Sequence, residues 1–487
     1  MRRRADPRSV GADVSQNGAT GYPSGPAQWI ARDGSGGVAG SPRRILLLTT
    51  TYPPRTEVGA ARWEGFTPAL VRDGWGLDAI IEQPSQPEPP DWGRLARLPA
   101  DVRVAAIAVG LPWWHATLMR ARAQFRGIPP ATDNVNTRDR GPAIVTSGIK
   151  LREAMSAAVY AARSRQGVDA LGVAATSLAD DRHRIVISSG PPHYVHIAAA
   201  RLARQRHIPH VVDLRDPWGN AALPLSARFM PDRQLRRSEA PTLARASLII
   251  TNTIAAQRVL EGRFPALRDR IHCMPNGSDL EPIDASTLPR PTRFCIAHCG
   301  SLYLDRDPRP FLRAAGRVRE RLSLGPDDFR IVFMGAPARV AGRSLEELAN
   351  EAGLQEMFEE RPSGTREEAR QLLRESTMAV AFQGETRTQV PAKVFEYVAF
   401  PVWLLALVGA QSATADVLAN SDAMVMDIDD EAGAAEAIES CYLRFRAGES
   451  ARPVGWDGRF SRARQSERLV TELHRLETNA RRQRTTL

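Results

Sequence analysis

The sequence predicts an α/β protein made of two Rossmann-like domains that face a central cleft. Apolar runs typical of buried strands alternate with helical patterns along most of the chain, and such alternation produces parallel sheets covered by helices on both faces. The stretch 280–293 carries three prolines and no periodicity, so it is typical of a linker between two such series. A chain of 487 residues also exceeds one ordinary domain of about 100–200 residues.

The N-terminal domain is expected over residues 42–283. Its first strand is the apolar run at 44–52, followed by a loop with proline and glycine and then a helix over 60–74. The middle of this domain is less regular and predicts helices near 111–125 and 151–165. The remaining strands are predicted at 76–82, 102–109, 184–189, 210–214, 247–251 and 271–275.

The C-terminal domain is expected over residues 284–457. A helix over 310–322 follows its first strand, two helices are expected between its second and third strands, and another helix begins at Pro391. Residues 458–487 follow this domain and predict a long amphipathic helix. The strands are predicted at 294–300, 330–335, 378–383, 402–407 and 423–428.

Charge and composition narrow the classes of partner. The net charge is +10, but residues 1–44 contribute +4 and residues 459–487 contribute +5, so the middle of the chain is nearly neutral. This distribution argues against a chain-wide nucleic-acid surface. Residues 1–41 are rich in glycine, proline, serine and arginine and predict a disordered tail without the apolar core of a signal peptide.

The cysteines predict a reducing compartment and no metal centre. Four cysteines in a chain of this length do not make a disulfide framework, which favours a cytoplasmic location. Cys295, His298 and Cys299 invite a zinc interpretation. They lie in a predicted strand, however, where alternation puts both cysteines on one face and the histidine on the other. Small buried thiols are therefore favoured over a metal site.

Lys393 is one of only two lysines, the other being Lys150, in a chain whose Lys and Arg together number 65. It lies in PAKVFEY at the predicted start of a helix, where a cation opposes the helix dipole by roughly 0.3–1 kcal/mol. The arrangement becomes favourable if a phosphate binds the free backbone N–H groups there. Glu396, about one turn further on, could then accept hydrogen bonds from ribose hydroxyls. The alternative is a solvated Lys–Glu surface pair.

Other predicted strand ends carry matching features, and ligands of open parallel sheets bind at this edge. Gly300 and Ser301 form a tight turn with Arg306 close by, and Gly59 permits close backbone approach at a helix start. Each of these turns is common by itself, and the alternative is ordinary loop geometry. Their recurrence at corresponding places on two sheets favours a phosphate site between the domains.

The N-terminal domain offers candidates for the chemistry itself. His193 follows one strand, and Arg215 and Asp216 follow the next strand in the sequence DLRDPW. They could form a polar wall for a sugar or a diphosphate, with His193 moving a proton or binding hydroxyls. The alternative for DLRDPW is a structural corner held by salt bridges.

These residues resemble a known family. NGSDLEP, HCGSLY, FRIVFMG and PAKVFEYVAFPV are similar to the C-terminal half of GT-B glycosyltransferases of family four (glycosyl transferases group one), and SSGPPHYVH with DLRDPW is similar to the N-terminal half. The resemblance covers roughly residues 44–480. It implies the GT-B fold, with a final helix that crosses back to the N-terminal domain.

The resemblance also implies a function. We expect a hexosyltransferase-like enzyme of polysaccharide biosynthesis that transfers a sugar from a nucleotide-diphosphate sugar with retention of configuration, without a metal or other cofactor. Lys393 would contact the diphosphate and Glu396 the ribose, and Gly59 would lie against the phosphates or the sugar. Thr388 departs from the family pattern, since many members carry a glutamate at that position. An epimerase or hydrolase on the same fold, or a non-catalytic nucleotide-sugar-binding subunit, therefore remains an alternative.

Membrane contact is a further hypothesis. No apolar run approaches the roughly 18–20 residues that cross a bilayer. The stretch 111–126 combines Trp113, Trp114 and Leu118 with three arginines, a composition that suits the surface of an anionic leaflet and a lipid-linked acceptor. The alternative is a helix packed on the sheet.

Overall fold

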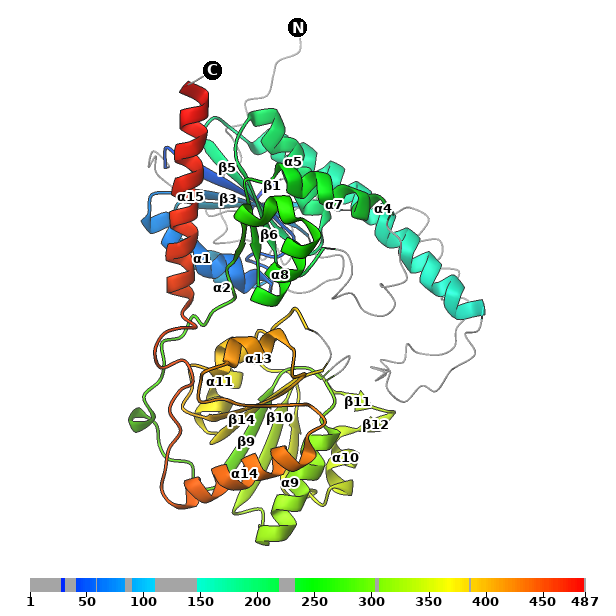
Figure 1. Cartoon of the computed structure of the whole chain (residues 1–487), viewed down its shortest axis with the longest axis vertical. Coiled ribbons are helices and arrows are strands. Elements are labelled where there is room, and N and C mark those ends of the chain that lie inside the picture. Colours follow the sequence, from blue (N-terminus) through cyan, green and yellow to red (C-terminus); the bar gives the residue numbers. More distant parts are fainter. Residues whose placement is uncertain are drawn as a thin grey trace, which may run out of the picture.

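The structure is a computed structural model that describes residues 28–30, 41–57, 59–83, 90–109, 147–218, 233–302, 306–384 and 387–485. The predicted tail, apart from residues 28–30 and 41, and the stretch 111–126 lie outside the described residues. The described chain forms two parallel-sheet domains, one above the other in Figure 1. The prediction of two Rossmann-like domains is confirmed.

The N-terminal domain is built on an eight-stranded sheet of order β1-β4-β3-β2-β5-β6-β7-β8. The strands from β2 onward pair in parallel, and β1 joins the edge antiparallel to β4. Their apolar sequences explain their burial on both faces. The strands are β1 (Gln28–Trp29), β2 (Arg44–Thr49), β3 (Gly76–Glu82), β4 (Val102–Ile107), β5 (His183–Gly190), β6 (His210–Leu214), β7 (Leu248–Thr251) and β8 (Ile271–Cys273).

Helices cover both faces of this sheet. One face packs against α4 and α5 through residues such as Leu171 and Leu202, and the other packs against α1 through Trp63 and Phe66. The helices of this domain are α1 (Ala60–Arg72), α2 (Trp92–Ala96), α4 (Ser147–Leu178), α5 (Tyr194–Arg206), α7 (Arg233–Arg245) and α8 (Ile254–Arg263), with a 3-10 turn at Pro265–Arg270.

The C-terminal domain has a six-stranded sheet of order β13-β10-β9-β14-β15-β16, parallel throughout. The strands are β9 (Phe294–Cys299), β10 (Phe329–Met334), β13 (Phe358–Arg361), β14 (Met378–Gln383), β15 (Trp403–Val408) and β16 (Met424–Met426), beside a two-stranded ribbon of β11 (Arg339–Val340) and β12 (Arg343–Ser344). The helices are α9 (Arg309–Leu322), α10 (Leu345–Glu351), α11 (Arg366–Arg374), α12 (Val394–Tyr397), α13 (Ala413–Leu418) and α14 (Glu431–Arg446).

Two local predictions in this domain are wrong. The chain forms the edge strand β13 between α10 and α11, where only helices were expected. The strand was not predicted because its sequence, FEER, lacks the apolar run that marks the other strands. The helix expected from Pro391 begins only at Val394. Residues 391–393 form a turn instead, and Lys393 caps the short helix α12.

The final helix, α15 (Arg462–Thr485), returns to the N-terminal domain as expected (Figure 1). Its residues Leu469, Leu473 and Leu476 are buried in the same core as Trp63 of α1. Where α15 begins, the Arg462 backbone N–H donates to the Ser278 carbonyl at 2.9 Å. This bond joins the segment that leaves the N-terminal domain to the segment that returns to it. Among the described helices, none is both long and apolar enough to cross a membrane.

Candidate functional site

The turn after β9 has the geometry expected of a phosphate-binding loop. Gly300 has φ +154°, a conformation that favours glycine, and a side-chain carbon added at the neighbouring Gly335 would lie 2.3 Å from the Gly300 carbonyl oxygen. The Tyr397 hydroxyl accepts a hydrogen bond from the Cys299 N–H at 2.7 Å and lies 3.1 Å from the Cys299 carbonyl, to which it donates. Helix α12 therefore fixes the turn that precedes Ser301.

The structure brings the predicted donor-binding residues of this domain together. A side-chain carbon at Gly300 would lie 3.6 Å from Cγ of Lys393, and Arg306 Nη1 donates to the Ser301 carbonyl at 3.2 Å. The Lys393 ammonium lies 3.6 Å from Glu396 Oε2, and its side chain is 35% exposed. The Gly300 N–H itself donates to the Met334 carbonyl at 2.8 Å. The turn at Ser301 and two cations thus meet at the carboxyl edge of the sheet, where a diphosphate could bind.

Glu396 is more occupied than the sequence suggested. Besides Lys393, it accepts a hydrogen bond from Arg366 Nε at 2.8 Å, and Arg366 also lies 3.4 Å from Asp279, just before the linker. The Glu396 side chain is 15% exposed. A ribose hydroxyl would therefore share this carboxylate with Arg366.

His298 is a member of this site that the sequence analysis considered only as a metal ligand. Its Nδ1 lies 2.9 Å from the Val380 carbonyl, and its buried Nε2 has no hydrogen-bond partner among the described residues. That nitrogen lies 3.7 Å from where a side chain at Gly300 would begin. Burial lowers the pKa of His298 to about 4, so the site holds a neutral imidazole. Its position two residues before Gly300 is the signal that could have identified it.

Arg215 lies at the carboxyl edge of the N-terminal sheet. Its Nη1 donates to Thr51 Oγ1 at 2.5 Å, and its Nη2 donates to the Pro191 carbonyl. A side-chain carbon at Gly59 would lie 2.1 Å from Nη1, so Gly59 makes room for this guanidinium. The expected close approach at Gly59 is present, but the group that approaches in this structure is Arg215.

Arg62, which follows Gly59 in the first turn of α1, belongs to a separate network. It is buried and donates to Asp213 at 3.0 Å, to Asn276 at 3.1 Å and to the Met274 carbonyl at 2.8 Å. Asp213 is also held by Trp63 Nε1 at 2.8 Å. The DLRDPW corner is thus divided. Asp213 lies in a buried structural network, Arg215 binds Thr51 and Pro191 of its own domain, and Asp216 binds Gln389 of the C-terminal domain.

His193 and Asp216 differ in their suitability for proton transfer. His193 is buried against the Trp218 ring at 5.3 Å, and burial together with Arg215 lowers its pKa to about 3. This favours hydrogen bonding to hydroxyls over proton uptake near neutral pH. Burial raises the pKa of the Asp216 carboxyl, which accepts a hydrogen bond from Gln389 Nε2 of the other domain at 2.6 Å.

The buried histidines predict a pH dependence of stability. Burial lowers the pKa of His193 and His210 to about 3, and that of His196 well below the usual value. Their unfolded pKa is about 6.5, so the unfolded chain binds more protons below that pH. The free energy of unfolding should fall between about pH 6.5 and 4, by about 1.4 kcal/mol per pH unit for each histidine. Denaturant titrations at several pH values measure this dependence. A plot of unfolding free energy against pH should have a shallower slope for His210→Gln than for wild type, and the same slope for the exposed His207→Asn.

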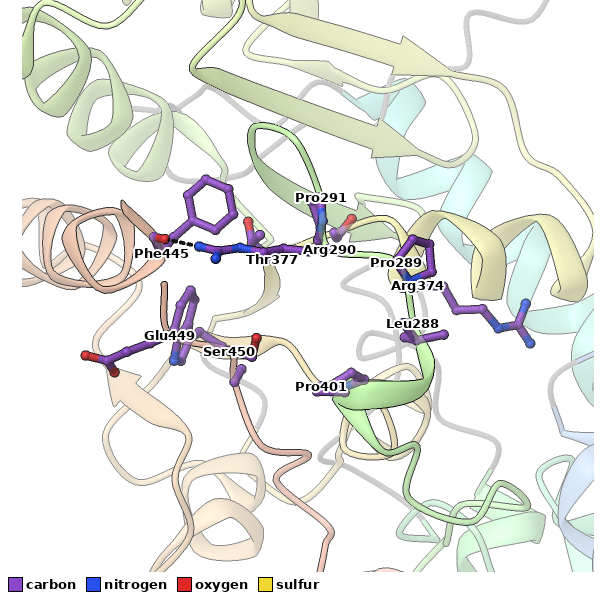
Figure 2. Close-up of a pocket in the computed structure, with 14 residues that line it drawn as sticks. Leu288, Pro289, Arg290, Pro291, Arg374, Thr377, Pro401, Phe445, Glu449 and Ser450 are labelled. Atoms are coloured by element: carbon purple, nitrogen blue, oxygen red, sulfur yellow. Dashed lines mark hydrogen bonds between the residues drawn. The ribbon is translucent and has the colours of Figure 1, made fainter. Parts of the chain in front are cut away.

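Two cavities lie apart from this site. The cavity in Figure 2 lies at the amino edge of the C-terminal sheet, and its lining includes Thr377, Trp403 and the linker residues Leu288 and Arg290, whose guanidinium donates to the Phe445 carbonyl at 2.5 Å. The second is lined by Thr253, Cys273 and Arg468 among others. Neither contains the predicted donor-binding residues.

The cysteines are arranged as the alternation predicted. Cys295 and Cys299 are buried in the core on one face of the sheet, whereas His298 contacts Phe333 and Phe382 on the other. All four cysteines are free thiols. Within the described ranges, no three side chains of His, Cys, Asp or Glu are grouped to hold a metal ion.

Comparison with solved structures identifies the fold, whereas no family profile and no curated protein matches the chain. The α,α-trehalose 6-phosphate synthase of Burkholderia multivorans aligns with a TM-score of 0.53 and 13% identity over 91% of this chain and 98% of its own. HepE of Anabaena, in complex with UDP-glucose, aligns with a TM-score of 0.51 and 12% identity over 91% of this chain and 100% of its own. The chain has the GT-B fold. A glycosyltransferase of Rickettsia africae aligns with a TM-score of 0.51 and 12% identity over 89% of this chain and 98% of its own.

Proposed function

We propose that this GT-B chain is a glycosyltransferase that moves a sugar from a nucleotide-diphosphate sugar to a glycan, lipid-linked or small-molecule acceptor. The observation that carries the proposal is the convergence of the Gly300 turn, Lys393 and Glu396 at one sheet edge, in a domain whose Gln389 also binds Asp216 of the other domain. A pyrophosphate between the two edges would meet cations from both domains. Strand-end loops of paired Rossmann-like domains are a common location for such ligands.

The proposed chemistry is mainly electrostatic. The Gly300 N–H donates to the Met334 carbonyl at 2.8 Å, so the Ser301 N–H is the backbone donor that this turn offers. Lys393, Arg306 and the Ser301 N–H would bind the donor diphosphate and stabilise the negative charge that develops on it as the leaving group departs. Protein cations would take the place of a divalent metal, and transfer would retain the anomeric configuration. His193 and Asp216 would receive the acceptor, with Asp216 taking its proton, since burial raises the pKa of this carboxyl and makes the carboxylate a stronger base.

The nature of the donor is suggested by the structural neighbours. HepE was solved with UDP-glucose, and an α,α-trehalose-phosphate synthase from Burkholderia vietnamiensis with a TM-score of 0.51 is described as UDP-forming. We therefore propose a uridine diphosphate sugar as the first donor to test. A cytoplasmic enzyme with residues 111–126 at the membrane surface, and domains divided at residue 283, completes the proposal.

A non-catalytic nucleotide-sugar-binding subunit is the second candidate, and Thr388 favours it. This residue replaces the carboxylate that the resembling family usually places near the transferred sugar. Its side chain is buried, and its Oγ1 has no hydrogen-bond partner among the described residues. Donor binding without hydrolysis or transfer would support this candidate.

The first experiment is a thermal-stability screen of the full chain with UDP-, GDP-, TDP- and ADP-sugars, with and without EDTA. A ligand at 100 times its dissociation constant stabilises a protein by about 2.7 kcal/mol. We expect one nucleotide class to raise Tm equally in the presence and absence of EDTA. The absence of stabilisation by every donor, or stabilisation that needs magnesium, would contradict the proposal.

A further inference from the structure

Thr388 and Gln389 of the C-terminal domain contact the N-terminal domain. Gln389 Nε2 donates to Asp216 Oδ1 at 2.6 Å, and the Thr253 hydroxyl donates to the Thr388 carbonyl at 2.8 Å. Thr253 is buried and also caps α8, since its Oγ1 accepts from the Ala256 N–H at 3.0 Å. Two adjacent residues of one domain are thus bound by two separate elements of the other.

Gln389 is held firmly on its own domain. Gln383, at the buried end of β14, donates from Nε2 to the Gln389 carbonyl at 2.7 Å. Gln383 is in turn fixed by a hydrogen bond from the Thr414 hydroxyl of α13. The backbone of Gln389 is therefore anchored to the C-terminal sheet, while its side chain reaches the N-terminal domain.

Asp216 needs such a partner to keep one orientation. It follows β6 directly beside Arg215, whose guanidinium hydrogen bonds go to Thr51 and the Pro191 carbonyl. Within the described part of the chain, the Asp216 carboxylate accepts a side-chain hydrogen bond from Gln389. Separation of the domains would break this bond and free the carboxylate to rotate.

We propose that Gln389 is a positioning residue that orients the Asp216 carboxylate only when the two domains are together, so that closure and correct placement of the carboxylate are one event. This inference rests on the proposed function for the role of Asp216 in transfer. The bond itself is independent of any donor. The amide of Gln389 acts on the acceptor side of the cleft, whereas the donor would bind at the Gly300 turn and Lys393.

The test uses a pair of exchangeable substitutions in the full chain. Gln389→Ala removes the amide that donates the hydrogen bond to Asp216. Gln389→Glu places a second carboxylate against that of Asp216. Adding Asp216→Asn to Gln389→Glu restores one donor and one acceptor with their roles exchanged. Gln371→Ala, an exposed glutamine on α11, is the matched control. The readouts are the radius of gyration from small-angle X-ray scattering without ligand, and separate kcat and donor KM values.

We expect Gln389→Ala and Gln389→Glu to enlarge the radius of gyration and to lower kcat by about 10- to 100-fold, the usual effect of a lost hydrogen bond to a charged group, with donor KM little changed. The double variant should return to the wild-type radius although its activity stays low. An unchanged radius in both single variants, or a double variant that stays open, would overturn the inference. If wild-type protein binds no nucleotide sugar, the proposed function fails. The scattering result still decides whether the Gln389–Asp216 hydrogen bond holds the two domains together.

Discussion

Lys393→Ala should lower kcat/KM for the donor by about 10²- to 10³-fold, the loss typical of removing one group that stabilises developing charge. The ammonium lies beside the Gly300 turn and is paired with Glu396 at 3.6 Å. In the variant, the leaving diphosphate keeps the Ser301 N–H and Arg306 but loses the second of the two cations beside the turn. Steady-state kinetics with the donor identified by the stability screen would measure the effect.

Controls separate this effect from unfolding and from a general change in charge. The Lys393 side chain is partly exposed, so its truncation should leave Tm within a few degrees of wild type. Arg317→Ala removes the same charge from an exposed position on α9 of the same domain and should leave turnover unchanged. Equal activities of wild type and Lys393→Ala would show that the diphosphate does not bind at this edge.

Arg62→Met should lower the free energy of unfolding by about 3–5 kcal/mol, because it leaves the buried Asp213 carboxylate without its cation. Arg62 is 3% exposed and Asp213 is fully buried, and the pair joins α1 to β6. Arg62 also donates to Asn276 and to the Met274 carbonyl at the start of the interdomain connection. The substitution therefore weakens both the first domain and its exit toward the second.

Denaturant titration would measure this loss, with Arg72→Met as the comparison. Arg72 is exposed in the last turn of the same helix, and its substitution should change stability by less than about 0.5 kcal/mol. A loss below 1 kcal/mol for Arg62→Met would mean that the network around Asp213 contributes little to the fold. Substituting Asp213 by asparagine in the same background should recover part of the loss, since no unpaired charge then remains.

The fold was predictable because it depends on local patterns. Buried strands such as β2 and β14 are continuous apolar runs, and their alternation with helices determines a parallel sheet. The grouping of Gly300, Lys393 and Glu396 was also predictable, since carboxyl ends of parallel strands meet at one edge. The edge strand β13 was missed because its sequence is charged and only half-buried.

The contacts that join distant segments could not be read from the sequence. Asp216 and Gln389 are 173 residues apart, and nothing in either local sequence indicates that they meet. Arg62 is separated from Asp213 by 151 residues, so its local sequence does not indicate that it pairs with a buried carboxylate. Burial of His193 against Trp218 likewise depends on tertiary packing and changes the chemistry that its imidazole can perform.

The central claim is that a pyrophosphate binds between the two domains and is neutralised by protein cations. A crystal structure of the full chain with a nucleoside diphosphate tests it most directly. The account predicts phosphate oxygens within hydrogen-bond distance of the Ser301 N–H and of Lys393 Nζ, with no metal ion between them. A diphosphate bound elsewhere, as in the arginine-lined cavity of Figure 2, or held through a divalent cation, would contradict the claim.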